Sequence, residues 1–321
     1  MKAVRVRVPA TTANLGPGFD TIGMALNLWN EAVFVQTGDG CISVQVCGEG
    51  ADSLPTDGQN LVAKAALQLY ALVGEKPEGF RVHCINRIPL ASGLGSSSAA
   101  MLTGLLGANA LLGEPLSPEE LLALSVRAEG HPDNIAPAML GGLVTAILKG
   151  DRVIFRKLRV KLLAVTVVFP NFPFPTRLAR AILPTHIPRQ DAIYNLGRVP
   201  LVLKALEEGD LDLLGEVMDD ALHQPYRLPL IPGAEAAMEA ARQAGAAAVA
   251  LSGAGPSLIA FSAHPCPAIG YAMQRAFQEA GLAARVFHLR ISRQGATVQR
   301  DERPVTEKWE RTSLAKAYAS I

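Results

Sequence analysis

The sequence predicts an α+β protein made of two domains, and three observations support this fold class. Apolar and polar residues alternate, with Gly and Asp turns, over residues 1–50, which indicates a group of strands. Residues 88–113 carry no charge and begin with a Gly/Ser-rich stretch, which is typical of a loop entering a buried helix. From about residue 162 to 291, strand and helix signals follow the βαββαβ order of a ferredoxin-like sandwich.

The first half of the chain is expected to combine strands with several helices. Helical apolar spacing covers residues 60–73, and the uncharged helix should end near residue 112. A further helix should begin at Ser117-Pro118-Glu119-Glu120, because Ser is a good N-cap, Pro suits the first helical position and Glu suits the first turn. Strands are expected at residues 4–10, within 31–40 and 41–50, and at 79–88, 141–148 and 151–155.

The second half begins after a change in composition. Six prolines fall in residues 170–200, and the segment after them is helical in pattern. We place the domain boundary near residue 155, which gives an N-terminal domain of residues 1–155 and a C-terminal domain of 156–293. Residues 294–321 are charged and should form a loosely packed tail. The expected strands are 162–169, 247–251, 258–261 and 285–291, with helices at 176–182, 190–207, 210–222, 233–244 and 268–280.

The composition excludes several classes of function. Lys and Arg number 30 against 29 Asp and Glu, so the formal net charge is +1, too little for a broad basic face that binds nucleic acid. A ligand with only a few phosphates stays possible. Four scattered cysteines predict reduced thiols in a cytoplasmic protein. Because glycines interrupt the uncharged stretch and serines crowd its start, we expect a buried helix and no membrane association.

The strongest chemical signal is the segment Pro89-Leu90-Ala91-Ser92-Gly93-Leu94-Gly95-Ser96-Ser97-Ser98-Ala99. Glycines let the backbone approach a ligand, and the start of the following helix offers free N–H groups that suit a phosphate. The segment has no Lys, so it is not a Walker A loop. It also lacks the third glycine and the acidic residue of a dinucleotide fingerprint. An ordinary Gly/Ser turn before a buried helix is the alternative.

Two other glycine-rich segments change the balance between these interpretations. Residues 11–20 follow the first strand and combine two glycines, a proline, an amide and a carboxylate, while residues 252–257 (SGAGPS) lie between two expected strands. Each segment alone is more often a turn. Three such loops, each at the end of a strand, are better explained by a shared ligand.

Together these segments resemble the GHMP small-molecule kinases, which include galactokinases, homoserine kinases and mevalonate kinases. Residues 89–99 resemble the phosphate loop of that family, and residues 251–257 resemble its C-terminal glycine motif. PATTANLGPGFDTIGMAL at residues 9–26 and GHPDNIAP at 130–137 are similar to the homoserine kinase branch. The match runs from about residue 3 to 290. It implies an N-terminal α/β domain with a left-handed crossover, packed on a ferredoxin-like C-terminal domain.

The resemblance implies a binding site for an amino acid. Asn14 and Asp20 match residues that face the substrate, and Asp20 would pair with its ammonium group. Arg180 and Arg227 match the arginines that clamp its carboxylate, a task that suits the guanidinium fork. Without the resemblance, both arginines would be taken for surface residues.

The resemblance also implies the reaction: transfer of the γ-phosphoryl group of ATP to the hydroxyl of L-homoserine. His131 and Asn134 match residues near this hydroxyl. Asn134 stands where galactokinases and mevalonate kinases have an Asp, and an amide cannot act as a base. Positioning and charge stabilisation could then carry most of the catalysis, because phosphoryl transfer has a loose transition state. The neighbouring Asp133 is expected to point elsewhere.

The expected cofactors are ATP and Mg2+. Asn60 matches a residue near the adenine, residues 89–99 would hold the phosphates, and Ser97 matches a magnesium ligand. Many relatives have a second ligand, a Glu, eight residues before the His, where this chain has Ala123. We expect Glu129 or a water molecule to take its place.

Three other functions stay open on the sequence alone: a GHMP kinase for a sugar or an isoprenoid, a GHMP-fold decarboxylase, and a non-catalytic ligand-sensing protein. The two arginines and Asn134 argue against the first two, and the intact phosphate loop argues against the third. The expected partners are L-homoserine and ATP, without nucleic acid or membrane, and a homodimer is expected although no residue pattern specifies it.

Overall fold

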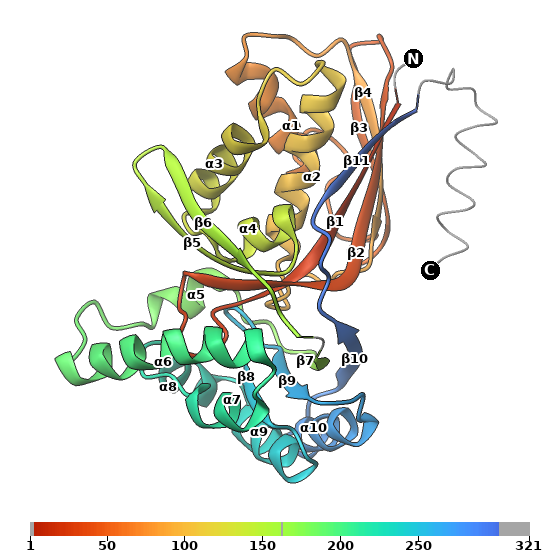
Figure 1. The fold of residues 1–321 in the computed structure, drawn as a ribbon. Helices are drawn as coiled ribbons and strands as arrows, with labels where there is room; N and C mark the ends of the chain where they lie inside the picture. Colours follow the sequence, from red (N-terminus) through yellow and green to blue (C-terminus); the bar gives the residue numbers. More distant parts are fainter. Residues whose placement is uncertain (1–2, 162, 302–321) are drawn as a thin grey trace.

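Two sheets, each covered by helices, make up the computed structural model, which describes residues 3–161 and 163–301 (Figure 1). The first sheet has the order β11-β1-β2-β4-β3, and β5 extends it by pairing with β2 and β6. The second sheet has the order β10-β7-β9-β8. The first-sheet strands are β1 (Ala3–Ala13), β2 (Ile22–Gln36), β3 (Ile42–Gly48), β4 (Phe80–Asn86), β5 (Leu143–Lys149), β6 (Arg152–Leu158) and β11 (Thr297–Asp301).

The second sheet confirms the ferredoxin-like prediction. Its strands are all antiparallel, and the two outer helices pack on one face, as the βαββαβ order requires. The strands are β7 (Ala164–Pro170), β8 (Ala248–Leu251), β9 (Leu258–Ser262) and β10 (Ala284–Arg290), and the two helices are α9 (Ala234–Gln243) and α10 (Pro267–Glu279).

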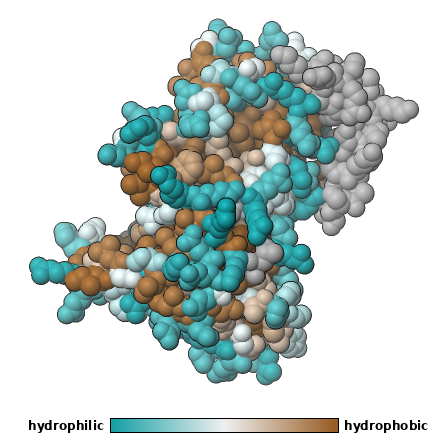
Figure 2. Space-filling view, viewed as in Figure 1, coloured by the Kyte–Doolittle hydropathy of each residue, from teal (hydrophilic) through white to brown (hydrophobic). Residues whose placement is uncertain are grey.

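Additional helices follow β7: α5 (Thr176–Ala181), α6 (Arg189–Glu208), α7 (Leu211–Val217), α8 (Gln224–Arg227) and the 3-10 turn Leu228–Leu230. Of these, α5 and the first half of α6 form an arm that projects from the second domain (Figure 1). Leu178, Ile187, Ile193 and Leu196 are exposed along α5, α6 and their connection, and brown side chains mark this arm at the lower left of Figure 2. The arm therefore presents apolar surface to the solvent.

Two features of the first sheet differ from the expected domain division. Strand β6 runs through residue 155, so the first sheet continues beyond the boundary that we placed there. Residues 297–301, which we expected in a loose tail, pair antiparallel with β1, and Val298 lies opposite Val6. The prediction of a tail from residue 294 is wrong for this stretch, because the edge of β1 gains hydrogen-bond partners from it. The rest of the expected tail, residues 302–321, lies outside the described residues.

The connection from β3 to β4 passes through α1 (Leu61–Leu72), and these two strands are parallel. The resemblance implies a left-handed crossover in this domain, and its hand stays a prediction. Three more helices, α2 (Ser96–Leu111), α3 (Pro118–Glu129) and α4 (Pro132–Leu140), lie on the same side of the sheet (Figure 1). Helix α3 begins with the expected N-cap: Ser117 and Glu120 form a reciprocal capping box.

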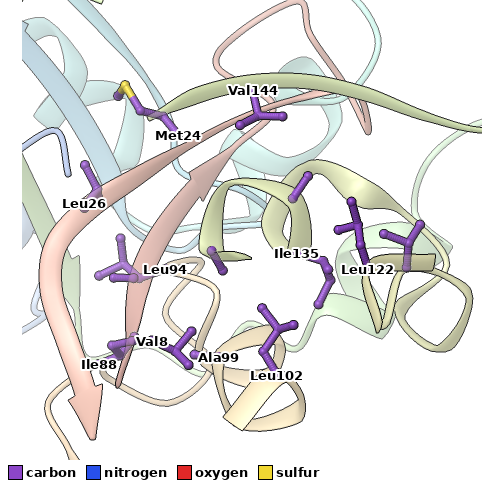
Figure 3. Packing of buried hydrophobic residues seen from close by; sticks show 14 of the residues in the cluster. Val8, Met24, Leu26, Ile88, Leu94, Ala99, Leu102, Leu122, Ile135 and Val144 are labelled. Atoms are coloured by element: carbon purple, nitrogen blue, oxygen red, sulfur yellow. The ribbon is translucent and has the colours of Figure 1, made fainter. Parts of the chain in front are cut away.

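The uncharged helix α2 lies inside the first domain, where it packs on α1, β1 and β2. Figure 3 shows Ala99 and Leu102 of this helix among the buried residues of the core. Its glycines allow this close packing. A Cβ atom at Gly104 would lie 2.2 Å from the carbonyl oxygen of Val62, and one at Gly107 would lie 2.3 Å from the ring of Phe34. None of the helices in the described part of the chain has the length and apolarity that a membrane span needs.

The two domains share a hydrophobic cluster. Val165 and Val167 of β7 and Ile259 and Phe261 of β9 belong to the same buried cluster as the core of the first sheet. A separate cluster lies beneath α9 and α10. The loops at the ends of the two sheets are therefore held against each other by apolar packing, which fixes the geometry of any site between them.

Candidate active site

The three glycine-rich loops meet at the junction of the two domains, as a shared ligand requires. The backbone N–H of Thr11 donates to the carbonyl of Leu94 at 3.1 Å. The hydroxyl of Ser252 donates to the carbonyl of Gly93 at 2.9 Å, and the N–H of Gly253 donates to the carbonyl of Ala13 at 3.1 Å. Segments far apart in the sequence thus form one continuous backbone surface.

The geometry of the loop before α2 depends on its glycines. Gly93 and Gly95 have φ values of 79° and 70°, which glycine adopts without strain. A Cβ atom at Gly93 would lie 2.2 Å from the carbonyl oxygen of Ser252, so no larger residue fits there. Gly95 is the N-cap of α2 and supplies no side-chain cap, so the N–H groups that follow it can bind an anion.

Glu129 reaches the start of α2 from the last turn of α3. Its carboxylate accepts hydrogen bonds from the hydroxyls of Ser98 at 2.9 Å and Ser97 at 3.4 Å. Ala123, at the position where many relatives carry a Glu, is buried in α3. The carboxylate and hydroxyl oxygens gathered here are the hard donors that Mg2+ prefers, so this set fits a magnesium ion.

On the other side of the junction, Asp20 and Arg180 form a bidentate ion pair. The two nitrogen–oxygen distances are 2.6 and 3.0 Å, although the residues are 160 positions apart. The hydrogen bonds that Arg180 donates to Asp20 raise the pKa of Arg180 above its ordinary value and outweigh the opposing effect of burial. The two residues expected to bind opposite ends of an amino acid therefore pair with each other.

Arg227 is buried, with 1% of its surface exposed. Its Nε donates to the carbonyl of Ala179 at 2.9 Å, and its Nη1 lies 3.3 Å from Nδ1 of His223 and 3.4 Å from the carbonyl of Gly253. Burial, followed by the positive charge of Arg180, lowers its pKa to about 10. No carboxylate among the described residues forms an ion pair with this guanidinium, and a buried cation of this kind favours an anionic ligand.

Phe19 links these charged groups. Its ring stacks on His223 with 5.3 Å between centroids, and the guanidinium carbons of Arg180 and Arg227 lie 5.7 and 5.3 Å from its centre. Both arginines are within cation–π distance of the ring. Sequence reasoning did not single out Phe19, although this residue lies next to Asp20 in the glycine-rich segment of residues 11–20.

The start of α4 places three polar side chains at the same junction. Asn134 accepts a hydrogen bond from the hydroxyl of Thr11 at 2.8 Å through Oδ1. His131, the N-cap residue of α4, has Nδ1 in contact with the carboxylate of Asp133. Burial lowers the pKa of His131, but the hydrogen bond and charge of Asp133 outweigh this effect and raise it overall.

The expectation that Asp133 points elsewhere is wrong. Because the first helical turn brings its carboxylate back over the N-cap, Asp133 contacts His131 and is itself buried. Asp20 also lies in this group, since ligand atoms of Asp20, His131 and Asp133 are within 4.8 Å of one another. With Nδ1 engaged by Asp133, the ring of His131 has Nε2 left for a substrate.

Two predicted site residues have structural tasks in the protein. Asn14 donates to the carbonyl of Gly253 at 2.8 Å and accepts from the N–H of Asp20 at 3.0 Å, so it holds Asp20 in place. Asn60 caps α1 by accepting from the N–H of Val62 at 3.0 Å, and it donates to the carbonyl of Pro55 at 2.8 Å. Contacts of these two residues with a substrate stay predictions.

Known proteins match the chain over most of its length. The pattern for the GHMP kinases N terminal domain matches residues 60–142, and that for the GHMP kinases C terminal domain matches residues 202–277. A homoserine kinase from Moorella thermoacetica is 48% identical over 294 residues, covering 91% of this chain and 99% of the relative. A homoserine kinase from Carboxydothermus hydrogenoformans is 43% identical, and the match covers 91% of this chain and 96% of that relative.

A solved structure agrees with these matches. The crystal structure of homoserine kinase from Cytophaga hutchinsonii superposes with a TM-score of 0.82 at 31% identity, and the match covers 92% of this chain and 97% of that one. At this coverage the match spans both domains. The chain therefore belongs to the GHMP kinase family and, within it, to the homoserine kinases.

Proposed function

We propose that the protein phosphorylates L-homoserine with ATP to give O-phospho-L-homoserine, a step of threonine biosynthesis. The observation that carries the proposal is one junction with two kinds of binding group. Free helix N–H groups and glycine-rich backbone lie on one side, and Asp20, Arg180 and Arg227 lie on the other. Family membership supports ATP as the phosphoryl donor.

In this proposal the amino acid is held by its two charges. The ammonium group binds Asp20, and the carboxylate binds Arg180 and Arg227. Asp20 and Arg180 already form an ion pair, so the zwitterion replaces each partner with a group of the same charge and leaves neither unpaired. Buried Arg227 gains the carboxylate that it lacks, which favours its charged form.

The loop at residues 89–99 holds the phosphates through backbone N–H groups and the hydroxyls of Ser96, Ser97 and Ser98. Ser97 and Glu129 would hold a magnesium ion, which would neutralise part of the negative charge of the phosphates. Thr11 fixes the amide of Asn134, so that Nδ2 of Asn134 is free to donate to the substrate oxygen. Because an amide cannot take up the hydroxyl proton, His131 Nε2 is the basic atom that this segment offers.

The proposal extends to a cytoplasmic homodimer. All four cysteines are free, which suits a reducing compartment. The exposed apolar side chains of the arm, among them Ile193 and Leu196, offer surface for a second copy. Light scattering on the purified protein should give twice the mass of one chain, and the mass of a single chain would contradict this part.

A coupled assay of ADP release tests the reaction. L-Homoserine, L-serine, mevalonate, galactose and mevalonate diphosphate are supplied separately, each with ATP and magnesium. We expect strong release only with L-homoserine, and phosphorus NMR of the product should show a phosphate ester of its side-chain oxygen. Release with mevalonate or galactose instead would indicate another GHMP kinase, release of carbon dioxide from mevalonate diphosphate would indicate a decarboxylase, and no turnover would indicate a sensing protein.

A further inference from the structure

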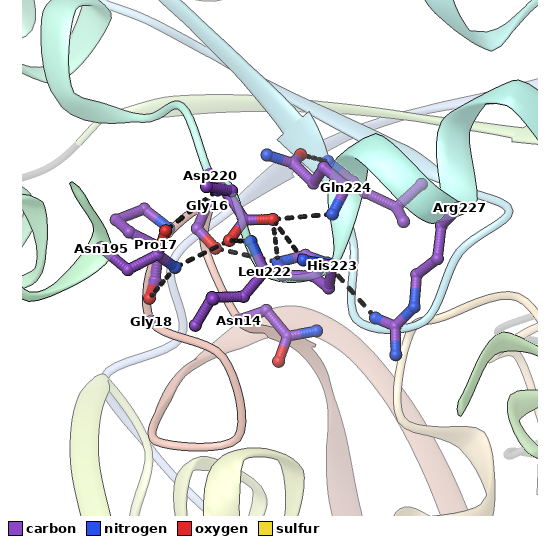
Figure 4. Close-up of polar contacts among 12 residues, drawn as sticks. Asn14, Gly16, Pro17, Gly18, Asn195, Asp220, Leu222, His223, Gln224 and Arg227 are labelled. Atoms are coloured by element: carbon purple, nitrogen blue, oxygen red, sulfur yellow. Dashed lines mark hydrogen bonds and ion pairs between the residues drawn. The ribbon is translucent and has the colours of Figure 1, made fainter. Parts of the chain in front are cut away.

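The second domain contains a buried polar network to which the proposed mechanism gives no task. It consists of Asn195, Asp220, His223 and Gln224, and it extends from the carbonyls of Gly16 and Pro17 to Arg227 (Figure 4). The side chains of Asp220 and His223 are completely buried. Burying an ionisable group costs free energy unless hydrogen bonds compensate for the lost water. The hydrogen-bond partners of each group therefore indicate what the network holds in place.

Asp220 fixes the backbone around His223. Its carboxylate accepts the N–H groups of Leu222, His223 and Gln224 at 2.8, 2.8 and 2.7 Å. It also accepts from Nδ2 of Asn195 at 2.7 Å, and the same nitrogen lies 3.1 Å from the carbonyl of Pro17. The start of α8 is therefore locked in position and tied to the glycine-rich segment that carries Asp20.

The partners of the His223 ring determine which nitrogen carries its proton. Nδ1 lies 3.3 Å from Nη1 of Arg227, and a guanidinium can only donate, so Nδ1 is the acceptor. Nε2 lies 2.9 Å from the carbonyl of Gly16, which can only accept, so Nε2 carries the hydrogen. Both contacts are satisfied by one neutral tautomer of the ring.

We propose that His223 is a positioning residue that directs the guanidinium of Arg227 toward the carboxylate of the amino-acid substrate. The inference rests on the proposed function. A neutral acceptor is suited to this task, because it orients the guanidinium without neutralising its charge. A carboxylate at the same place would pair with Arg227 and compete with the substrate. The ring of Phe19 stacks on the imidazole of His223 and limits the rotation of that imidazole.

Two amide variants separate the two contacts of the ring. In His223→Asn the amide can accept near the place of Nδ1, next to Arg227, whereas in His223→Gln it can donate near the place of Nε2, next to Gly16. If orienting Arg227 is the task, kcat/KM for L-homoserine falls at least about tenfold in His223→Gln, the loss typical of a hydrogen bond to a charged group. It stays within a few-fold of the parent in His223→Asn, and KM for ATP is unchanged in both.

Truncated ligands show which substrate group is affected. 4-Hydroxybutyrate keeps the carboxylate and lacks the ammonium group, while 3-amino-1-propanol keeps the ammonium group and lacks the carboxylate. Both compounds are tested as competitive inhibitors. 4-Hydroxybutyrate should bind to the His223→Gln variant at least about tenfold more weakly than to the parent, whereas 3-amino-1-propanol should bind equally well to both proteins. Phe277→Leu, which loosens the distant core of the second domain, serves as the control for lost stability alone.

Equal losses for both inhibitors, or equal behaviour of the Asn and Gln variants, would overturn the proposal. If neither variant folds, nitrogen NMR of the histidine rings in the parent protein decides: a neutral ring with hydrogen on Nε2 supports the proposal, and hydrogen on Nδ1 contradicts it. A parent without homoserine-dependent ADP release refutes the proposed function. An active parent with unselective losses refutes only the role of His223.

Discussion

The two sides of the proposed active site offer different kinds of groups to a charged ligand. Around the start of α2, the groups available to a phosphate are backbone N–H groups and serine hydroxyls, with Glu129 as a negatively charged side chain beside them. Around Asp20, by contrast, charged side chains are dense: two arginines, both within cation–π distance of Phe19, and the His131–Asp133 pair.

The difference explains how a protein with a net charge of +1 can handle a polyanion. Fixed dipoles and a metal ion can hold phosphates without a basic surface. A small zwitterion has no such repeated charge, so it must be recognised by side chains of both signs at fixed positions. The phosphate side therefore depends on backbone shape, and the amino-acid side depends on placed charges.

The largest expected effect comes from changing the backbone shape of the phosphate side. In Gly93→Ala the new Cβ would lie 2.2 Å from the carbonyl oxygen of Ser252, so the loops must separate. We expect activity to fall by about a thousandfold or more, because misplaced phosphates lose the contribution of orientation. Gly113→Ala is the control, since Gly113 has a similarly positive φ of 87° but no atom within 4 Å of the new Cβ. It should cost about 1–2 kcal/mol of stability and no activity, and equal inactivation of both variants would count against the backbone argument.

Removing a charge on the amino-acid side should reduce the activity somewhat less. Arg227→Met keeps a long apolar side chain and removes the buried cation. We expect kcat/KM for L-homoserine to fall about a hundredfold or more, which corresponds to roughly 3 kcal/mol or more for one partner of a buried charged pair. The KM for ATP should stay the same in initial-rate measurements. Arg285→Met, which removes an exposed ion pair with Glu49, is the control and should leave both constants unchanged. A loss confined to ATP binding in Arg227→Met would reverse the assignment of the two sides.

The next prediction concerns Glu129, the charged side chain on the phosphate side, and its proposed role in binding magnesium. In Glu129→Gln the oxygen beside Ser97 and Ser98 remains but the charge is lost. The magnesium concentration for half-maximal activity should rise about tenfold or more, as when a supporting group of a metal site is removed. Glu119→Gln, at the other end of α3, should leave it unchanged. An unaltered magnesium dependence in Glu129→Gln would remove Glu129 from the metal site and leave water as the second ligand.

The smallest effect concerns the pH dependence of stability. Burial lowers the pKa of His223 below 6.5, and the charge of Arg227 acts in the same direction, although Asp220, Asp20 and the carbonyl of Gly16 oppose them. Below pH 6.5 the unfolded chain takes up a proton that the folded protein does not, so stability falls as pH falls. Between pH 7 and 5.5 the parent should lose more stability than His223→Gln, by up to about 1 kcal/mol. Denaturant unfolding at both pH values measures this, and identical losses would show that the fold does not lower the pKa of His223.

Sequence reasoning succeeded where the determining residues are close together in the chain. The cap of α3 depends on Ser117 and Glu120, and the loop before α2 depends on two glycines, so local chemistry was enough to predict both. The ferredoxin-like order followed from strand and helix periodicity. The short strand β11 was missed because its stability comes from pairing with β1 rather than from its own composition.

The amino-acid side could not be derived in this way, because distant segments form it. Asp20 and Arg180 are 160 residues apart, and His223 lies 207 residues from Gly16. Matching motif positions to a family indicated the two arginines, but no motif indicated His223. The contact between Asp133 and His131 is local, yet it was missed because it depends on where the first turn of α4 begins.

The central claim is that the charged side recognises both ends of one zwitterion. The most direct test is to measure kcat/KM of the parent protein for L-homoserine, 4-hydroxybutyrate and 3-amino-1-propanol at saturating ATP. Each truncated compound loses one charge-assisted interaction, so each should be at least about tenfold poorer than L-homoserine. A truncated compound that is phosphorylated as efficiently as L-homoserine would contradict the claim, because one of the two charges would then go unrecognised.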